Sequence, residues 1–586
     1  MEVILGINAF HPDASACVLI DGQLKAAIAE ERLGTRSKHM PGFPAEAVKT
    51  VLALAGISVR DVNWLAVGHD SNANLQRKAL HVLANPLRAI NPVKDHLKRR
   101  KNIQSLNEVL ASACGYELDQ CRFQVQPVEH HVAHVASSFF ASPMDEAAAF
   151  SFDGAGDFVS GLYAHCKDTK IEVLDKVFLP SSLGYFYTSL CQFLGFMKFG
   201  EEYKVMGLSA YGKPSHMELM REILTISGSQ YRLNSAFVQA IGNRGLEDSI
   251  TEDHEIIVPP MYTDALVKRL GAPRNYGEEF SERDLDVSAS MQLHFEDVVL
   301  KCLSWLHGKV RSKNLITAGG CALNGVCNAR ILRESSFNRS YIQCAASDDG
   351  TAIGAALYVW HHILGKPRGF VMDNASYGSS STDEEIEVAL TASGLHFERL
   401  DRDALVTRVA EYLNKGQVVG WFQGRSEWGP RALGNRSLLA HPGWPGMKDL
   451  INQKVKRREA FRPFAPSILA EAVHEYFEQD LESPFMMHVV KIRPEKRQEL
   501  SAVCHEDSTG RLQTVTREQN ALYYDLIKEF GRLSGTPVVL NTSFNENEPI
   551  VETPEQAIAC YLRNDIDALA IGSYITSSAV NGKPTV

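Results

Sequence analysis

The chain has 586 residues, of which 45% are hydrophobic and 22% charged, and its formal net charge is −10. This composition is typical of a soluble globular protein and excludes a disordered or collagen-like chain. The length allows two large domains or about three to four ordinary ones. The first residues, MEVILGINAF, form a strand-like run without a basic leader, and no stretch has the ~18 consecutive apolar residues of a membrane span, so we expect a cytoplasmic protein.

The first half of the chain shows the same strand pattern twice. Three strands are predicted at 3–8, 16–21 and 24–31, the last two joined by the strong hairpin signal Asp21-Gly22. A similar pair of strands is predicted at 147–153 and 158–165, with the bend at 154–157. The repetition predicts a duplicated domain with two lobes that face a cleft.

Helices and a glycine-rich turn are predicted around and after these strands. A helix is expected over 44–56, and strand 314–318 is followed by a turn at 319–320 and a helix at 322–334. The sequence SDDGTAIGAALYVW opens a further helix at Asp348 or Asp349.

A polar, Gly/Ser-rich segment at 370–383 predicts a domain boundary. Beyond it, a helix at 383–393 and strands at 417–424 and 536–545 indicate a second α/β domain of roughly 200 residues. We therefore divide the chain into domains 1–370 and 371–586.

The second domain contains a basic segment, 424–466, in an otherwise acidic chain. It has nine Lys or Arg and three acids, a local charge of about +6. Turn formers and apolar residues between the cations favour arginines held in place to bind phosphate or carboxylate, and a solvated basic face is the alternative. The cations are Arg425, Arg431, Arg436, Lys448, Lys454, Lys456, Arg457, Arg458 and Arg462. A separate basic cluster, 98–101, is interpreted as a solvated helix face.

His130 and His134 are four residues apart in VEHHVAHVASSFF, so on a helix both imidazoles project from one face, while His131 points elsewhere. A pair of partly buried histidines without a metal is the alternative. Asp153, at the end of a predicted strand, and Asp348 or Asp349, at a strand-to-helix junction, could supply carboxylates. Two imidazoles with carboxylates favour iron(II), manganese or zinc over magnesium or calcium.

Other polar residues follow predicted strands. The turn Gly319-Gly320, before a helix that carries Asn324, could admit a phosphate or reflect close packing of the backbone. His11 and Asp13 follow the first strand. The eleven cysteines are scattered singly with no CxxC pair, and there is no GxxxxGK[ST], GxGxxG or GxSxG motif, which argues against disulfides, a thiolate zinc site, a Walker ATPase and a dinucleotide enzyme.

Nine segments in order resemble the carbamoyltransferase family that modifies nodulation signals and antibiotics. They are FHPDASA, HHVAH, FDGAGD, EEYKVMGLSAYG, GGCALN, SDDG, GRSEWGPRALGNRS, REAFRPFAPS and LNTSFN. The resemblance implies an α/β fold class, with a duplicated actin-like, metal-bearing first domain and a second domain similar to threonylcarbamoyl-AMP synthase.

The resemblance also implies an activity, ATP-dependent O-carbamoyl transfer. The second domain would convert carbamoyl phosphate and ATP, accompanied by Mg²⁺, into carbamoyl adenylate, and the first would transfer the carbamoyl group to a hydroxyl of a small molecule or sugar. The metal, iron by resemblance, would be held by His130, His134, Asp153 and Asp348, and His11 would be the base toward the acceptor. Pro12 separates His11 from Asp13, where many members have His-Asp.

The remaining residues implied by resemblance bind substrates. Arg431, Lys456, Arg462, Arg511, Ser543 and Asn545 would hold carbamoyl phosphate and the adenylate, and Gly319, Gly320 and Asn324 would face the nucleotide. Two alternatives are a tRNA threonylcarbamoylation enzyme, which the acidic total disfavours, and an actin-like nucleotide-switched scaffold. We expect no nucleic-acid or membrane partner, and leave open the acceptor and a homodimer.

Overall fold

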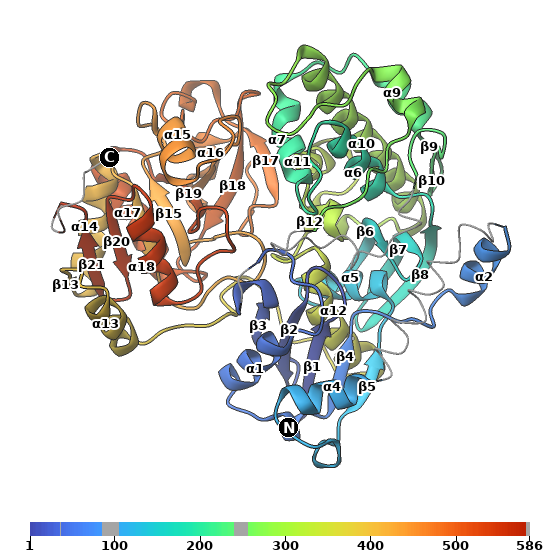
Figure 1. The fold of residues 1–586 in the computed structure, drawn as a ribbon, viewed down its shortest axis with the longest axis horizontal. Coiled ribbons are helices and arrows are strands. Elements are labelled where there is room, and N and C mark those ends of the chain that lie inside the picture. Colours follow the sequence, from blue (N-terminus) through green and yellow to red (C-terminus); the bar gives the residue numbers. More distant parts are fainter. Residues whose placement is uncertain (35–36, 85–104, 240–255, 580, 582–586) are drawn as a thin grey trace. The chain divides into compact units, whose positions relative to one another are not determined.

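The computed structural model describes residues 1–34, 37–84, 105–239, 256–579 and 581. These residues form two compact units, Met1–Met372 and Asp373–Val586 (Figure 1). The basic cluster at 98–101 lies outside the described residues. Among the helices that are described, none is both long and apolar enough to cross a membrane.

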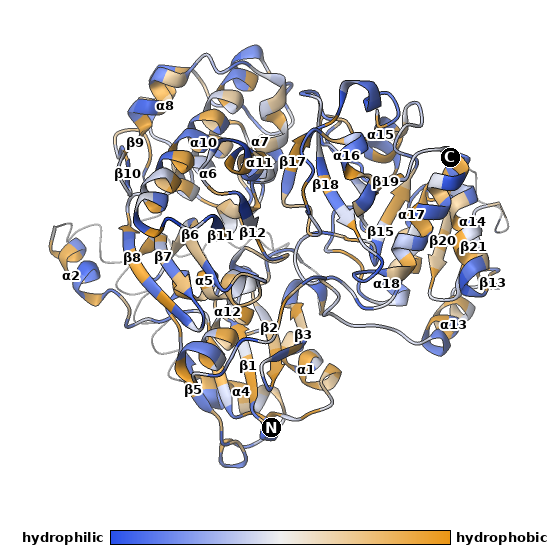
Figure 2. Ribbon diagram, turned by 180° about the vertical axis from the view of Figure 1, so that it is seen from behind, coloured by the Kyte–Doolittle hydropathy of each residue, from blue (hydrophilic) through white to orange (hydrophobic). Residues whose placement is uncertain are grey.

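The first sheet of the N-terminal unit has the strand order β3-β2-β1-β4-β5. Its strands β1 to β3 are antiparallel neighbours, whereas β1, β4 and β5 are parallel. The bounds are β1 Val3–Asn8, β2 Ser15–Ile20, β3 Gln23–Ala29, β4 Trp64–Val67 and β5 Gln124–Pro127. Every residue of β1 is buried, and the hydrophobic colour of β1 and β2 in Figure 2 marks this core.

The second sheet repeats this topology with the order β12-β11-β6-β7-β8. Strands β6 to β8 are antiparallel neighbours, and β6, β11 and β12 are parallel. The bounds are β6 Glu146–Gly156, β7 Val159–Lys167, β8 Lys170–Phe178, β11 Asn314–Ala318 and β12 Arg339–Tyr341. The predicted fold class, α/β with a duplicated actin-like first domain, is confirmed by this repetition.

Helices α5 (His130–Phe139) and α12 (Thr351–Tyr358) lie between the two sheets (Figure 1). Helix α5 contacts β6, β7 and β11, and α12 contacts β1, β2 and β4. Glycine permits the close crossing, because a Cβ on Gly354 would lie 1.8 Å from the carbonyl oxygen of Ala133. The two helices therefore cross each other near their N-terminal ends.

The other described helices of this unit surround the sheets. They are α1 Ala45–Leu54, α2 Leu75–Ala84, α4 Leu106–Ala113, α6 Leu183–Phe193, α7 Glu202–Leu208, α8 Met217–Ile223, α9 Asp264–Leu270, α10 Glu282–Val310 and α11 Gly325–Glu334. Strands β9 Leu224–Ser227 and β10 Gln230–Leu233 form a separate two-stranded sheet.

Two local predictions in this unit are wrong. The bend predicted at 154–157 begins later, because β6 continues through Gly156 and the turn is formed by Asp157 and Phe158, with φ of 51° and 73°. Asp153 therefore lies within β6 and does not end it. Asp348 opens a short 3₁₀ turn before α12, but strand β12 ends seven residues earlier, so a loop separates strand and helix.

The C-terminal unit contains a mixed nine-stranded sheet with the order β13-β21-β20-β14-β15-β19-β16-β18-β17. Its bounds are β13 Glu398–Arg399, β14 Val419–Phe422, β15 Arg436–Ala440, β16 Ala465–Leu469, β17 His488–Lys491, β18 Thr509–Val515, β19 Val538–Ser543, β20 Ala568–Ile571 and β21 Tyr574–Ser577. The helices are α13 Asp383–Ala392, α14 Arg402–Asn414, α15 Met447–Leu450, α16 Val473–Tyr476, α17 Ala521–Ser534 and α18 Pro554–Arg563.

Candidate functional site

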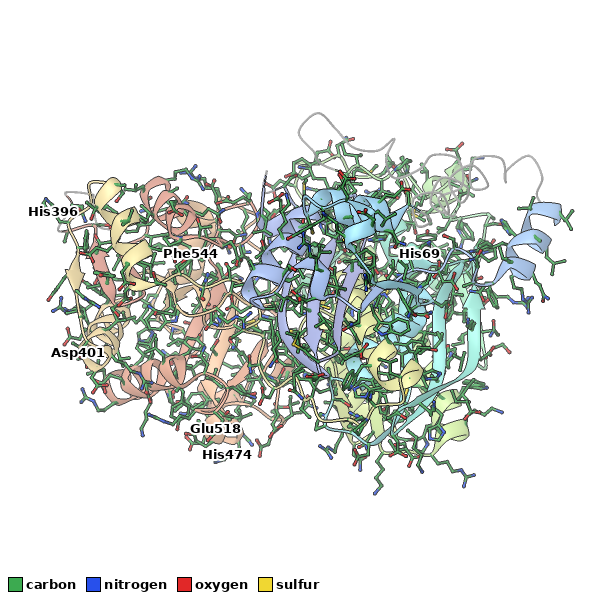
Figure 3. The ribbon with its side chains drawn as sticks, turned by 90° about the horizontal axis from the view of Figure 1, so that it is seen from below. His69, His396, Asp401, His474, Glu518 and Phe544 are labelled. Carbon is green, nitrogen blue, oxygen red and sulfur yellow. The ribbon has the colours of Figure 1, made fainter. Side chains whose placement is uncertain are left out.

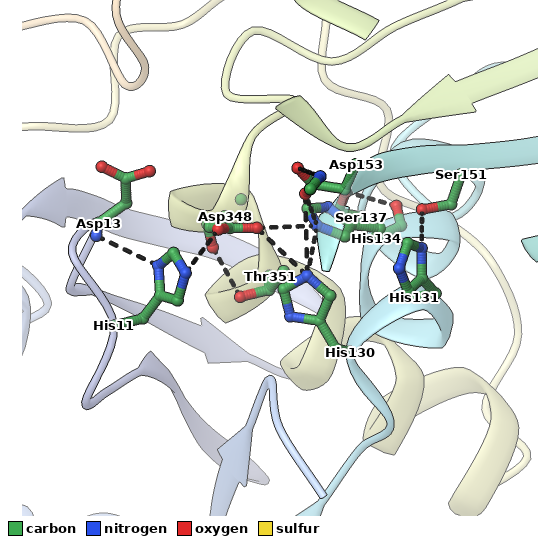
Figure 4. Close-up of polar contacts among 12 residues, drawn as sticks. His11, Asp13, His130, His131, His134, Ser137, Ser151, Asp153, Asp348 and Thr351 are labelled. Atoms are coloured by element: carbon green, nitrogen blue, oxygen red, sulfur yellow. Dashed lines mark hydrogen bonds and ion pairs between the residues drawn. The ribbon is translucent and has the colours of Figure 1, made fainter. Parts of the chain in front are cut away.

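Four predicted ligands meet at the starts of α5 and α12 (Figure 4). His130 and His134 project from the same face of α5, as their spacing predicts. Asp153 comes from β6 of the second sheet, and Asp348 from the 3₁₀ turn before α12. Residues more than 200 positions apart in the sequence thus form one buried cluster.

The nitrogen His134 Nε2 lies 3.0 Å from His130 Nε2, from Asp348 Oδ1 and from Asp153 Oδ2. An imidazole nitrogen carries at most one proton, so it cannot donate to all three partners. Asp153 Oδ2 is buried, and its contact with His134 lacks the geometry of a hydrogen bond. Ligand atoms about 2.1 Å from one ion have separations similar to these, so the donor set fits a divalent metal.

The pKa values of these groups are shifted by one another's charges. Burial alone would lower the pKa of His130, but Asp348 and Asp153 raise that pKa well above its ordinary value. Burial alone would raise the pKa of Asp348, yet the neighbouring His11 and His130 hold it well below the usual range. The neighbouring histidines lower the pKa of Asp153 in the same way, so both carboxylates are ionised and paired with the imidazoles.

The third histidine of the motif has a different role. His131 Nδ1 lies 2.8 Å from Ser151 Oγ, and its Nε2 lies 3.0 Å from the carbonyl oxygen of Val159. Burial and the adjacent His130 and His134 lower the pKa of His131 to about 3. It joins α5 to the second sheet as a neutral side chain, which agrees with the prediction that it points elsewhere.

His11 also reaches the cluster, from the loop between β1 and β2. Its Nε2 lies 3.0 Å from Asp348 Oδ2, on the side of the carboxylate away from His134. The backbone N–H of Asp13 donates to His11 Nδ1 at 3.4 Å, and the carboxylate of Asp13 pairs with His39 at 2.6 Å. The structure places His11 beside the candidate metal centre, and its role as a base stays a prediction.

The glycine turn after β11 lies beside the same cluster. A Cβ on Gly319 would lie 2.3 Å from the carbonyl oxygen of Phe152, so this position serves close backbone packing. Gly320 faces Asp153, whose Oδ1 would be 3.1 Å from an added Cβ. Asn324 Oδ1 accepts from the N–H of Cys327 and caps α11, and its amide group also bonds Gln292. Contact of these residues with a nucleotide stays a prediction.

In the C-terminal unit, Lys456, Ser543 and Asn545 form a second cluster. Lys456 is buried, and four oxygens compete for its three N–H donors, namely Ser543 O, Ser543 Oγ, Asn545 O and Asn545 Oδ1, at 2.7, 3.1, 2.8 and 2.5 Å. All four are neutral oxygens, so they do not cancel the charge of the ammonium. A lysine held in this way suits an anion.

The other predicted phosphate ligands lie on neighbouring segments. Arg462 pairs with Glu459 at 3.5 Å. Arg511 lies on β18, near His505. Burial lowers the pKa of His505 to about 4, and the positive charges of Arg511 and Lys448 contribute to this shift. Arg431 is partly buried in the loop between β14 and β15.

Three arginines of the basic segment stabilise the fold. Arg436 is fully buried, and its guanidinium donates to the carbonyl oxygens of four residues, which are Ser379, Gln423, Gly424 and Asn435. Arg425 donates to the carbonyl oxygens of Tyr377 and Gly378, and Arg458 bonds Asn452. The basic charge of this segment is thus divided between structural arginines and residues such as Lys456.

The sequence reasoning missed two residues next to the metal cluster. Asp157 accepts a hydrogen bond from the N–H of His130 at 2.9 Å, and its other oxygen lies 2.6 Å from His69. Asp157 was visible as the last residue of DGAGD, but His69 has no local motif, because its partner lies 88 positions later.

Comparison with family models covers most of the chain. The model "Carbamoyltransferase N-terminus" matches residues 3–357, and "Carbamoyltransferase C-terminus" matches residues 410–578. Among solved structures, HypF of T. kodakarensis is similar over 62% of this chain and 48% of its own, with 14% identity and a TM-score of 0.30.

Curated relatives match over nearly the whole length. The uncharacterized protein sll1178 of Synechocystis is 36% identical, over 98% of this chain and 96% of its own. Nodulation protein NolNO of Sinorhizobium fredii is 37% identical, over 97% of this chain and 79% of its own. Since the N-terminal family model alone spans more than half of the residues, and relatives at 36% and 37% identity match 98% and 97% of this chain, the chain belongs to the carbamoyltransferase family and is a transferase.

Proposed function

We propose that this enzyme is an ATP-dependent O-carbamoyltransferase, in which the C-terminal unit makes carbamoyl adenylate and the N-terminal unit transfers the carbamoyl group to a hydroxyl of a small molecule or sugar. The observation that carries the proposal is the buried convergence of His130, His134, Asp153 and Asp348 in a carbamoyltransferase-family chain. The conversion of carbamoyl phosphate, ATP and water to the adenylate, pyrophosphate and phosphate balances in atoms.

Activation gathers several negative charges, and cations around the reacting groups stabilise the charge that develops. Lys456, held by Ser543 and Asn545, supplies one such cation, and Arg431, Arg462 and Arg511 are proposed to hold the remaining phosphate oxygens. Mg²⁺ would accompany ATP in this step.

Transfer needs an electrophilic carbamoyl carbon and a deprotonated acceptor. A divalent metal at the N-terminal cluster, with iron(II) as the candidate, would act as a Lewis acid. His130, His134, Asp153 and Asp348 would hold it. His11, at the edge of the same cluster, would take the proton of the acceptor hydroxyl. Gly319, Gly320 and Asn324 would face the nucleotide.

The proposal is tested by pyrophosphate release from ATP, with and without carbamoyl phosphate, in the absence of an acceptor. Wild-type enzyme should release pyrophosphate only with carbamoyl phosphate. Lys456→Ala and Arg462→Ala should each reduce the rate by at least about 100-fold, because each removes a cation from the charge that develops.

Lys454→Ala is the matched control, since Lys454 is exposed in the same segment. It should keep the wild-type rate. Circular dichroism should show that all variants fold. Undiminished pyrophosphate release by folded Lys456→Ala and Arg462→Ala would refute the assigned activation site.

A further inference from the structure

The turn between β6 and β7 carries a buried carboxylate that reaches the start of α5. Asp157 has a positive φ of 51°, and its side chain is completely inaccessible to solvent. One oxygen, Oδ2, accepts the backbone N–H groups of His130 and Asp70, both at 2.9 Å. Strand β6 thus supplies Asp153 to the metal cluster, and the turn that follows it supplies Asp157 to the helix.

Asp157 takes the place of a local helix cap. Helix α5 begins at His130, and the preceding residue, Glu129, makes no side-chain capping hydrogen bond. The first N–H groups of a helix need acceptors, and a carboxylate at this end is also favoured by the helix dipole. The cap of α5 therefore comes from the turn between β6 and β7, and it holds the backbone of a candidate metal ligand.

The second oxygen of the Asp157 carboxylate pairs with His69. His69, which is labelled in Figure 3, lies with its Nδ1 2.6 Å from Asp157 Oδ1. Its side chain is 20% exposed. Burial alone would raise the pKa of Asp157, but His69 and the N–H donors lower it to about 2, so the carboxylate stays ionised. Asn74 Nδ2 donates to the carbonyl oxygen of Asp157 at 3.0 Å and fixes the turn.

The ring of His130 is itself confined by the residue that precedes Asp157. A Cβ on Gly156, the residue before Asp157, would lie 2.0 Å from His130 Cδ2. The ring thus lies directly against the turn, and the backbone N–H of the same residue is bound to that turn. A displacement of Asp157 would therefore move His130 Nε2 relative to His134, Asp153 and Asp348.

We propose that His69 is a positioning residue, which holds Asp157 against the N-terminus of α5 and thereby orients His130 at the metal cluster. The inference rests on the proposed function in that it takes the cluster to be a metal centre. Partners behind a metal ligand typically change metal affinity by about 10- to 100-fold when they are removed.

The test compares His69→Ala and His69→Asn in the full-length protein. The amide nitrogen of asparagine occupies the place of Nδ1 and can still donate to Asp157, whereas alanine cannot. Apoprotein is titrated with Co²⁺ and its visible spectrum recorded. His69→Ala should bind Co²⁺ about 10- to 100-fold more weakly with an altered spectrum, and His69→Asn should bind close to the wild-type affinity.

His165→Ala is the control, because His165 also pairs with a carboxylate, Glu146, at 2.7 Å, but at the opposite end of β6 from Asp157. It should bind Co²⁺ as wild type does. If His69→Ala fails to fold, His69→Gln takes its place, since the amide nitrogen of glutamine matches Nε2 and cannot reach Asp157 in the same way.

Hydrogen exchange of the first turn of α5 in apoprotein is a second readout, independent of metal. It should be faster in His69→Ala and restored in His69→Asn. If wild type binds no Co²⁺, the metal centre of the proposed function fails, and this exchange still decides the role of His69. Wild-type Co²⁺ affinity and spectrum in folded His69→Ala, or exchange that asparagine does not restore, would overturn the inference.

Discussion

At the residue scale, the metal cluster depends on a glycine, Gly156, which has no side chain. The strand β6 passes so close to α5 that Gly156 leaves no room for a methyl group, since an added Cβ would lie 2.0 and 2.1 Å from His130 Cδ2 and Cγ. These atoms belong to a ring fixed in the core, so the clash cannot be relieved by a flexible side chain.

Gly156→Ala should therefore displace His130, weaken Co²⁺ binding and destabilise the N-terminal unit by about 1–3 kcal/mol. Thermal unfolding and Co²⁺ titration measure the two effects. Gly308→Ala is the matched control, because an added Cβ in the long helix α10 meets nothing within 4 Å. It should leave Co²⁺ binding unchanged and stabilise the helix by roughly 0.5–1 kcal/mol. Equal Co²⁺ affinity in both variants would contradict the argument.

Site residues could be predicted from the sequence where their partners lie close by along the chain, and could not where the partners are far apart. His130 and His134 could be predicted, because helical periodicity places residues four apart on one face. His69 could not, because its role depends on contact between the end of β4 and a turn after β6, and a single sequence carries no signal of that contact. Arg436 was counted among the candidate anion ligands, but its burial against four carbonyl groups depends on neighbouring loops.

At the element scale, hairpin and helix signals were reliable where the turn chemistry was local. Asp21 and Gly22 both adopt positive φ, 48° and 79°, as the Asp-Gly hairpin predicts. The bend at 154–157 was misplaced, because the glycines there serve close approach: Gly156 lies against His130, and an added Cβ on Gly184 would lie 2.6 Å from the backbone nitrogen of Gly154. Glycine in a strand can mark such packing as well as a turn.

The start of β15 is held by Arg436, whose buried guanidinium connects this strand to two loops and lies 3.7 Å over the ring of Phe422 on β14. Arg436→Lys should destabilise the C-terminal unit by about 2–4 kcal/mol, because an ammonium cannot reproduce the planar fork that reaches several carbonyl groups. Urea-dependent hydrogen exchange of β14 and β15 measures the loss.

The control for this change is Arg457→Lys, since the side chain of Arg457 is 58% exposed. Its exchange should match that of wild type. A result in which both lysine variants are equally stable would show that the buried arginine contributes charge alone and that its geometry is not needed.

At the scale of the whole molecule, the two proposed chemistries lie in separate compact units. All four candidate metal ligands and His11 belong to Met1–Met372, whereas Lys456, Arg462, Ser543 and Asn545 belong to Asp373–Val586. All nine strands of the C-terminal sheet come from the second unit, so that unit has its own core. A natural consequence is that activation and transfer can be separated physically.

Fragments 1–372 and 373–586, expressed separately, should each fold and divide the activities. The second should release pyrophosphate from ATP in the presence of carbamoyl phosphate, because every residue assigned to that step lies in it. The first should bind Co²⁺, since both of its large sheets and all four ligands are retained. It should release no pyrophosphate, since it lacks the residues assigned to activation. Unfolding scans establish folding, and the Lys456→Ala form of 373–586 is the control for contaminating activity. Pyrophosphate release by the first fragment would place the activation site in that unit. Its absence from a folded second fragment would show that the activation site requires residues from both units.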